Sequence, residues 1–205
     1  ITCMLIGVLV GTVSLTGLGL RLSEAIMRLS DFGGLYAAAL LSAVLCTVLG
    51  MGVPGVAAYV IVASVVAPTL VEAGAAPMAA HMFCLFYACL SNITPPVAIS
   101  AYVAGGIAGS DRTKTALLAV KLGLVGFLLP LFFLRNPALL WGVTGVPAWR
   151  AATAALTAAM GGGALSAALF WRSEGDRRAA ERAFLLAGAL CLLDPNQATD
   201  WIGLA

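Results

Sequence analysis

Charged side chains are scarce in this chain. Asp, Glu, Lys and Arg together make up 10% of its 205 residues, whereas 61% are hydrophobic. Soluble globular domains normally carry about 25% charged residues. The mean hydropathy is +1.03, and several apolar runs approach membrane-spanning length. We therefore predict an integral membrane protein, and the net charge of +2, spread over short connectors, gives no basis for nucleic-acid binding.

The groups that catalysis or a transition metal would need are also few. The chain has a single histidine, His81, and five cysteines without CxxC spacing, and it lacks GxSxG and HExxH motifs. A hydrolytic site needs a nucleophile with a base, and a zinc site needs several Cys or His ligands. An intramembrane enzyme is therefore disfavoured, and we predict no enzyme, no cofactor and no transition-metal site. The cysteines are interpreted as small apolar packing residues.

Two polar breaks interrupt the apolar sequence. They are Gly-Met-Gly-Val-Pro-Gly at 50–55 and Ser-Asn-Ile-Thr-Pro-Pro at 91–96. In hydrocarbon every freed backbone group needs a partner, so such breaks persist only where they are buried or line a cavity. Two of them in one chain predict a transport site. The alternative, kinks in purely structural helices, stays open because membrane helices tolerate Gly and Pro.

The first break lies between two short apolar arms. Residues 35–49 and 56–71 would extend only about 22 to 24 Å as helices, less than a hydrocarbon core of about 30 Å. This pattern predicts a re-entrant hairpin over 35–71 that turns near mid-membrane. Two thin full spans joined by a surface loop remain the alternative.

The second break divides what would otherwise be one span over 78–108. The consecutive prolines Pro95 and Pro96 remove two N–H donors, and Pro95 also pushes Thr94 out of helical geometry. We therefore predict a discontinuous helix with unwound backbone in its middle.

The remaining segments complete an all-α, polytopic helical bundle. We predict a span at 3–20, an amphipathic interfacial helix at 21–30, a span at 113–134 and an Ala- and Gly-rich span at 151–171. The sequence Asp-Phe-Gly-Gly at 31–34 is predicted to break the interfacial helix. Residues 1–140 form the predicted core and 141–205 a C-terminal helical extension. The small residues of 151–171 would permit close helix packing, so a structural anchor or assembly subunit is the alternative function.

The breaks have a predictable chemistry. Carbonyl-rich turns and C-terminal ends of half-helices coordinate Na⁺, whereas N-terminal ends attract anions. One hairpin tip facing one broken helix could thus hold a cation and a carboxylate together. The predicted cation-binding residues are Gly50, Gly52, Ser91, Asn92 and Thr94.

Two further polar residues lie in apolar segments. A proton relay is conceivable for His81, but we interpret it as a packed, hydrogen-bonded side chain because no acid lies within a helical turn or two. Lys121 could meet an anionic substrate, although extension of its charged end toward the interface is the preferred interpretation.

Five stretches, in order along residues 1–140, resemble the large, DctM-like membrane subunit of the tripartite ATP-independent periplasmic (TRAP) transporters. They are LGMGVP at 49–54, AH at 80–81, LSNITPPV at 90–97, AGSD at 108–111 and NPAL at 136–139. The similarity is to the C-terminal half of that subunit, and the extended tail resembles the form in which small and large subunits are fused.

The resemblance implies one half of an inverted-repeat, elevator-type transporter, in the cytoplasmic (inner) membrane of a bacterium or archaeon. It further implies Na⁺-coupled import of an organic anion such as a C4-dicarboxylate, an extracytoplasmic solute-binding protein and a small membrane subunit. The first hairpin and first broken helix of the repeat would lie in a longer polypeptide. The residues that the resemblance places at the substrate are Met51, Val53, Pro54, Pro95 and Pro96.

Overall fold

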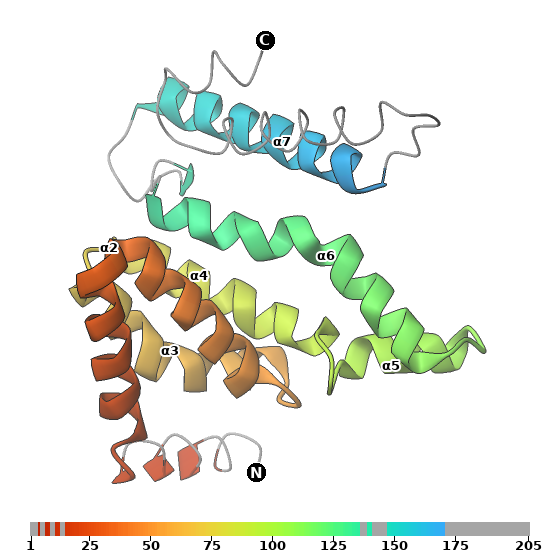
Figure 1. Ribbon diagram of the computed structural model, residues 1–205, viewed down its shortest axis with the longest axis horizontal. Coiled ribbons are helices and arrows are strands. Elements are labelled where there is room, and N and C mark those ends of the chain that lie inside the picture. Colours follow the sequence, from red (N-terminus) through yellow and green to blue (C-terminus); the bar gives the residue numbers. More distant parts are fainter. Residues whose placement is uncertain are drawn as a thin grey trace. The chain divides into compact units, whose positions relative to one another are not determined.

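The computed structural model describes residues 4, 7–8, 11–12, 15–135, 139–140 and 147–170. Every regular element in that part of the chain is a helix, which confirms the all-α prediction (Figure 1). The chain divides into two compact units, 1–134 and 135–205, which are described separately. Part of the predicted span at 3–20 falls outside the described residues, and everything beyond 170 falls wholly outside them.

Helix α2 (Leu18–Gly50) is bent at Gly34, where φ is 63° and ψ is −160°. Glycine adopts a positive φ without the steric cost of a Cβ atom. The bend separates the segment that the sequence predicts as interfacial from the first arm of the hairpin. The helix continues through residues 31–33, where the sequence predicts a break. Only Gly34 departs from helical geometry.

The first half of α2 is amphipathic. Ile26 is fully buried, whereas Arg21, Glu24 and Arg28 are exposed on the other faces. The hydroxyls of Ser23 and Thr69 lie 2.6 Å apart and join this half of α2 to the end of the next helix. The hydroxyl contact therefore holds this segment against the end of the hairpin.

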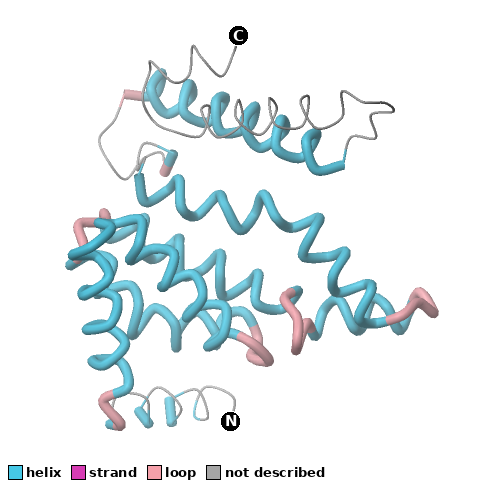
Figure 2. The backbone as a smooth tube through the Cα atoms, viewed as in Figure 1, coloured by secondary structure: helices cyan, strands magenta, loops and turns pink. Residues whose placement is uncertain are grey.

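The second half of α2 and helix α3 (Gly55–Glu72) pack side by side as a helical hairpin. Only residues 51–54 connect them, and this tip appears as a loop in Figure 2. Ala38, Cys46, Val62 and Val66 are completely buried in the hairpin core. Whether this hairpin re-enters the membrane or crosses it twice stays a prediction.

A broken helix packs against the hairpin. Helix α4 (Pro77–Leu90) continues into a short 3₁₀ turn, η1 (Ser91–Ile93), and the chain is then non-helical until α5 (Ile99–Ile107) begins. Thr94 is extended, with φ −92° and ψ 124°, as the following proline requires. Ala98 has a φ of 33°, a left-handed conformation that costs about 1 kcal/mol without glycine.

Helix α6 (Arg112–Arg135) is the most lipid-compatible element of the first unit. It and α3 are the two described helices that are long and apolar enough to cross a membrane. Only 17% of the apolar window in α6 is buried, compared with 56% in α3. Leu117, Leu118 and Leu122 are all exposed, as expected for a helix that contacts hydrocarbon.

The second unit contains helix α7 (Ala148–Phe170), which covers most of the predicted span at 151–171. Its sequence is rich in Ala and Gly, and Ser166 donates its hydroxyl proton to the carbonyl of Gly162 within the helix. Serine hydroxyls satisfied in this way are compatible with an apolar environment.

Asp111 caps the N-terminus of α6, because its Oδ1 accepts a 2.8 Å hydrogen bond from the main-chain N–H of Lys114. Replacing such a cap with alanine costs about 1 kcal/mol, whereas asparagine is an equally good cap. We expect Asp111→Ala to lower the melting temperature of the purified full-length protein and Asp111→Asn to leave it nearly unchanged. Equal losses in both variants would show that charge, not capping, matters here.

Candidate functional site

The hairpin tip and the helix break contact each other, although they lie about 40 residues apart in the sequence. A Cβ atom at Gly50 would lie 2.7 Å from Ser91 Oγ and 3.5 Å from Ala88 Cα. Real Cβ atoms do not approach other heavy atoms within 3.0 Å. A residue without a Cβ at position 50 is therefore required for α2 to come this close to the break, and the two polar segments lie in contact.

Two further glycines of the tip lie near residues that flank the break. A Cβ at Gly52 would be 3.6 Å from Val97 Cγ1, and one at Gly55 would be 3.7 Å from Cys89 Sγ. Gly52 also has a φ of 80°, which disfavours any residue with a side chain. The tip thus spans both sides of the break.

The tip is a tight turn between two helix ends. Val53 N–H donates to the Gly50 carbonyl at 3.3 Å, and Met51 N–H donates to the Val48 carbonyl at 3.3 Å. Helix α3 then begins directly after Pro54, without a side-chain cap on its first N–H groups. The C-terminal end of one helix and the N-terminal end of the next therefore lie at the same tip.

The break is organised by its own hydrogen bonds. Thr94 donates its N–H to the Ser91 carbonyl at 3.2 Å and its hydroxyl proton to the Leu90 carbonyl at 2.9 Å. The Tyr102 hydroxyl donates to the Pro96 carbonyl at 2.7 Å. Helix α5 also begins without a side-chain cap. The unwound segment is thereby held in a defined shape.

The site offers oxygen donors suited to a hard cation. Ser91 is fully buried and donates its hydroxyl proton to the Ala88 carbonyl at 2.7 Å. The Thr47 hydroxyl donates to the Ala43 carbonyl at 2.8 Å. A hydroxyl that donates in this way keeps its lone pairs for a ligand. The carbonyls of Gly50 and Ser91 each accept one backbone hydrogen bond and retain a second lone pair.

These donors resemble Na⁺ or Ca²⁺ ligands more than transition-metal ligands. Within the described ranges, no group of three or more His, Cys, Asp or Glu side chains could hold a metal ion. Carbonyl and hydroxyl oxygens are thus the donors that the structure brings together at this site.

The other predicted site residues are less enclosed. Asn92 is half-buried, and its amide donates to the Cys89 carbonyl at 3.5 Å, the limit of a hydrogen bond. Pro54 and Pro96 are exposed. Met51, Val53 and Pro95 are half-buried in the tip and the break. The structure shows no direct contact that would assign a substrate-binding role to these apolar residues.

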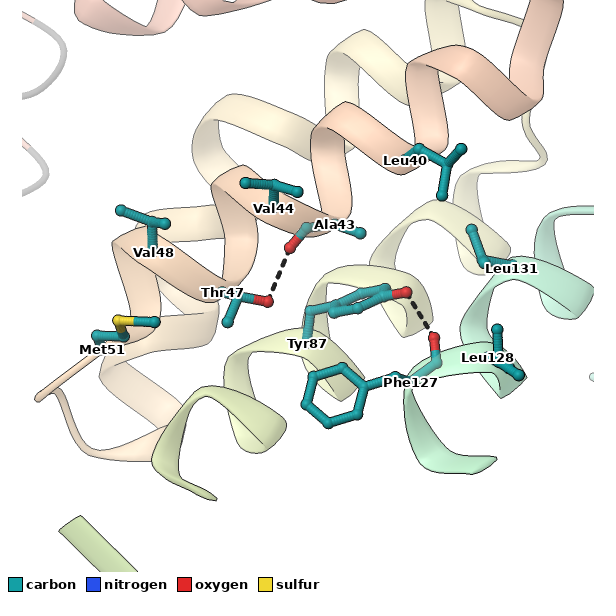
Figure 3. A pocket seen from close by; sticks show the side chains of 10 residues that line it. All are labelled: Leu40, Ala43, Val44, Thr47, Val48, Met51, Tyr87, Phe127, Leu128 and Leu131. Atoms are coloured by element: carbon teal, nitrogen blue, oxygen red, sulfur yellow. Dashed lines mark hydrogen bonds between the residues drawn. The ribbon is translucent and has the colours of Figure 1, made fainter. Parts of the chain in front are cut away.

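A pocket of about 400 Å³ lies beside the tip, between α2, α4 and α6 (Figure 3). Its lining is nearly all apolar, with Thr47 and Tyr87 as the polar exceptions. The Tyr87 hydroxyl donates to the Phe127 carbonyl of α6 at 2.6 Å, drawn as a dashed line in Figure 3. The lining residues are Leu40, Ala43, Val44, Thr47, Val48, Met51, Tyr87, Phe127, Leu128 and Leu131.

Sequence reasoning missed the glycines of α6. A Cβ at Gly123 would lie 2.9 Å from Ile93 Cδ1, and one at Gly126 would lie 3.4 Å from Leu90 Cδ2. The signal was present, because two glycines three residues apart share one helix face and permit close approach of a partner. It is easily missed because the sequence of α6 is otherwise that of an uninterrupted span.

His81 and Lys121 lie apart from the tip-to-break contact. The His81 ring is exposed, and its Nδ1 lies 3.0 Å from the Tyr59 hydroxyl, which joins α4 to α3. The hydrogen bond predicted for His81 agrees with this contact, whereas the exposure of its ring differs from the predicted packed side chain. Lys121 is exposed on α6.

Comparison with known proteins identifies the family of this chain. The family described as "Tripartite ATP-independent periplasmic transporter, DctM component" matches residues 1–148, which is more than half of the chain and includes both breaks. No curated protein and no solved structure matches the chain. The family is one of transporters, which confirms that the chain is not an enzyme. The chain belongs to the DctM component family of the tripartite ATP-independent periplasmic transporters, and it is part of a membrane permease.

Proposed function

We propose that the hairpin tip and the helix break form part of a shared Na⁺ and carboxylate site in a secondary importer of organic anions. The observation that carries this proposal is the contact of Gly50 with Ser91, which joins two polar breaks in an apolar protein. Membership in a transporter family supports the same conclusion. In this proposal Na⁺ is a co-transported substrate and not a resident cofactor.

The cation is held by oxygen atoms from both segments. The C-terminal end of α2 carries partial negative charge at Gly50, and the end of η1 does so near Ser91 and Asn92. Carbonyls of Gly50, Gly52, Ser91 and Asn92, with the Thr94 hydroxyl, supply the ligands. Sodium suits such neutral oxygen donors at the ends of half-helices.

The carboxylate is held by helix N-termini. Helices α3 and α5 both begin without a side-chain cap, so their first N–H groups are available to an anion. Residues 50–55 and 91–98 include no charged side chain, so the bound Na⁺ compensates the substrate's charge. This arrangement couples the two ligands, because each lowers the electrostatic cost of binding the other. Met51, Val53, Pro54, Pro95 and Pro96 shape the surrounding surface.

The transport cycle requires more than this chain segment. We propose that a solute-binding protein delivers the anion from outside the cytoplasmic membrane of a bacterium or archaeon, and that a small membrane subunit, separate or fused, completes the permease. A matching first hairpin and broken helix would supply the other half of the site. The hairpin and broken helix would then move together, elevator-like, as a rigid transport domain.

The role of the tip is tested by Gly50→Ala in the full-length permease. The added methyl group would displace Ser91, and a shift of about 1 Å in ligand positions can cost 10²-fold in rate. We expect Na⁺-dependent uptake of labelled carboxylates into proteoliposomes to fall at least tenfold, a conservative bound on that effect. Gly106→Ala is the matched control, because a Cβ at Gly106 meets nothing within 4 Å.

Wild-type uptake by Gly50→Ala, at normal abundance in the membrane, would refute the site assignment. It would then favour a scaffold role for this part of the chain. Equal loss in the Gly106→Ala control would show instead that any added methyl group disturbs folding.

Energy coupling is tested separately with the wild-type permease. We expect uptake of a labelled carboxylate mixture to require both an inward Na⁺ gradient and the cognate binding protein. Replacing Na⁺ by K⁺ at equal ionic strength controls for screening of surface charge. Uptake that needs neither would contradict Na⁺ coupling and binding-protein dependence.

A further inference from the structure

Two glycines of helix α6 meet the ends of side chains that flank the break. Gly123 approaches Ile93, and Gly126 approaches Leu90, so closely that a methyl group at Gly123 would lie 2.9 Å from Ile93 Cδ1. Leu90 and Ile93 are the residues on either side of Ser91 and Asn92. The break therefore contacts the hairpin tip through Ser91, and α6 through the side chains of Leu90 and Ile93.

A buried hydrogen bond fixes α6 in this position. Tyr87 is only 4% exposed, and its hydroxyl donates to the Phe127 carbonyl at 2.6 Å (Figure 3). Tyr87 precedes Ser91 by one helical turn, so the bond fixes α4 just before it unwinds. The rings of Phe86 and Phe133 meet edge to face with centroids 5.4 Å apart, which adds a second contact between the same two helices.

The geometry of an ion site depends on such supports. Carbonyl and hydroxyl ligands must lie within a narrow range of distances from the ion, and the residues behind them set that range. Ser91 and Asn92 belong to a 3₁₀ turn of only three residues. A turn this short has few hydrogen bonds of its own, so its position follows that of the helices packed against it.

We infer that α6, through Gly123 and the Tyr87–Phe127 hydrogen bond, positions the cation ligands at Ser91 and Asn92 and so sets Na⁺ affinity without contacting the ion. This inference rests on the proposed Na⁺ site. Gly123 and Tyr87 are thus positioning residues, and they act on the ion through Ile93 and through α4.

The test is a Na⁺ titration of the full-length permease at saturating organic anion. Gly123→Ala should raise the Na⁺ concentration for half-maximal uptake by roughly three- to tenfold, because the Ile93 side chain must turn away from the new methyl group beside the Ser91 and Asn92 ligands. Adding Ile93→Val removes the Cδ1 methyl group that the new Cβ would meet, and it should restore most of the wild-type value. Gly106→Ala serves as the matched control and should leave the Na⁺ dependence unchanged.

A second readout does not depend on transport. Na⁺ binding to the folded protein stabilises it by RT ln(1 + c/Kd) at a Na⁺ concentration c, so the dependence of the melting temperature on Na⁺ concentration reports Na⁺ affinity. Gly123→Ala should shift this dependence to higher Na⁺ concentrations by the same factor. Tyr87→Phe should shift the Na⁺ dependence of the melting temperature in the same direction. This variant tests the inference if Gly123→Ala does not fold.

An unchanged Na⁺ dependence in both variants would overturn the inference, even if maximal uptake fell. Failure of Ile93→Val to restore the Gly123→Ala variant would overturn it as well, because the proposed contact would not be responsible. Absence of any Na⁺ dependence in the wild-type protein would refute the proposed function itself, and this inference with it.

Discussion

The need to satisfy backbone polar groups in an apolar surrounding is the constraint on which the rest of this structure depends. The chain stops being helical at the tip and again at the break, and at both places it replaces lost helical hydrogen bonds with local ones. The Thr94 and Tyr102 hydroxyls donate to the Leu90 and Pro96 carbonyls, where the chain is no longer helical. Among the described buried side-chain atoms, Ser42 Oγ alone has no hydrogen-bond partner.

Much of this fold could be predicted from the sequence, because its main signals are local. Consecutive prolines force Thr94 into extended geometry whatever surrounds them, and glycines at the tip allow the turn that joins two short apolar arms. Helix limits were harder to predict. The predicted breaker at 31–34 bends α2 only at Gly34, because the burial of Ile26 and the contact of Ser23 with Thr69 favour a continuous helix before it.

The contacts that build the site could be predicted only in part. Placing both polar breaks in one site follows from the cost of exposing either to hydrocarbon. The pairing of individual residues could not be predicted, because sequence spacing alone does not pair Gly50 with Ser91 or Gly123 with Ile93. Those pairings depend on how far each helix can approach its neighbour, which is decided by the side chains of three helices together. The role of the α6 glycines in close helix approach is visible only when the position of α4 is known.

The hydroxyl contact between Ser23 and Thr69 has a consequence for depth in the bilayer. It joins an amphipathic segment to the open end of the hairpin, opposite the tip. A segment with Arg21 and Arg28 exposed and Ile26 buried is predicted to stay at the level of the lipid headgroups. The hairpin arm then acts as a spacer of fixed length, about 24 Å for 16 helical residues. On this prediction, the membrane surface is the reference plane from which the level of the proposed ion site is set.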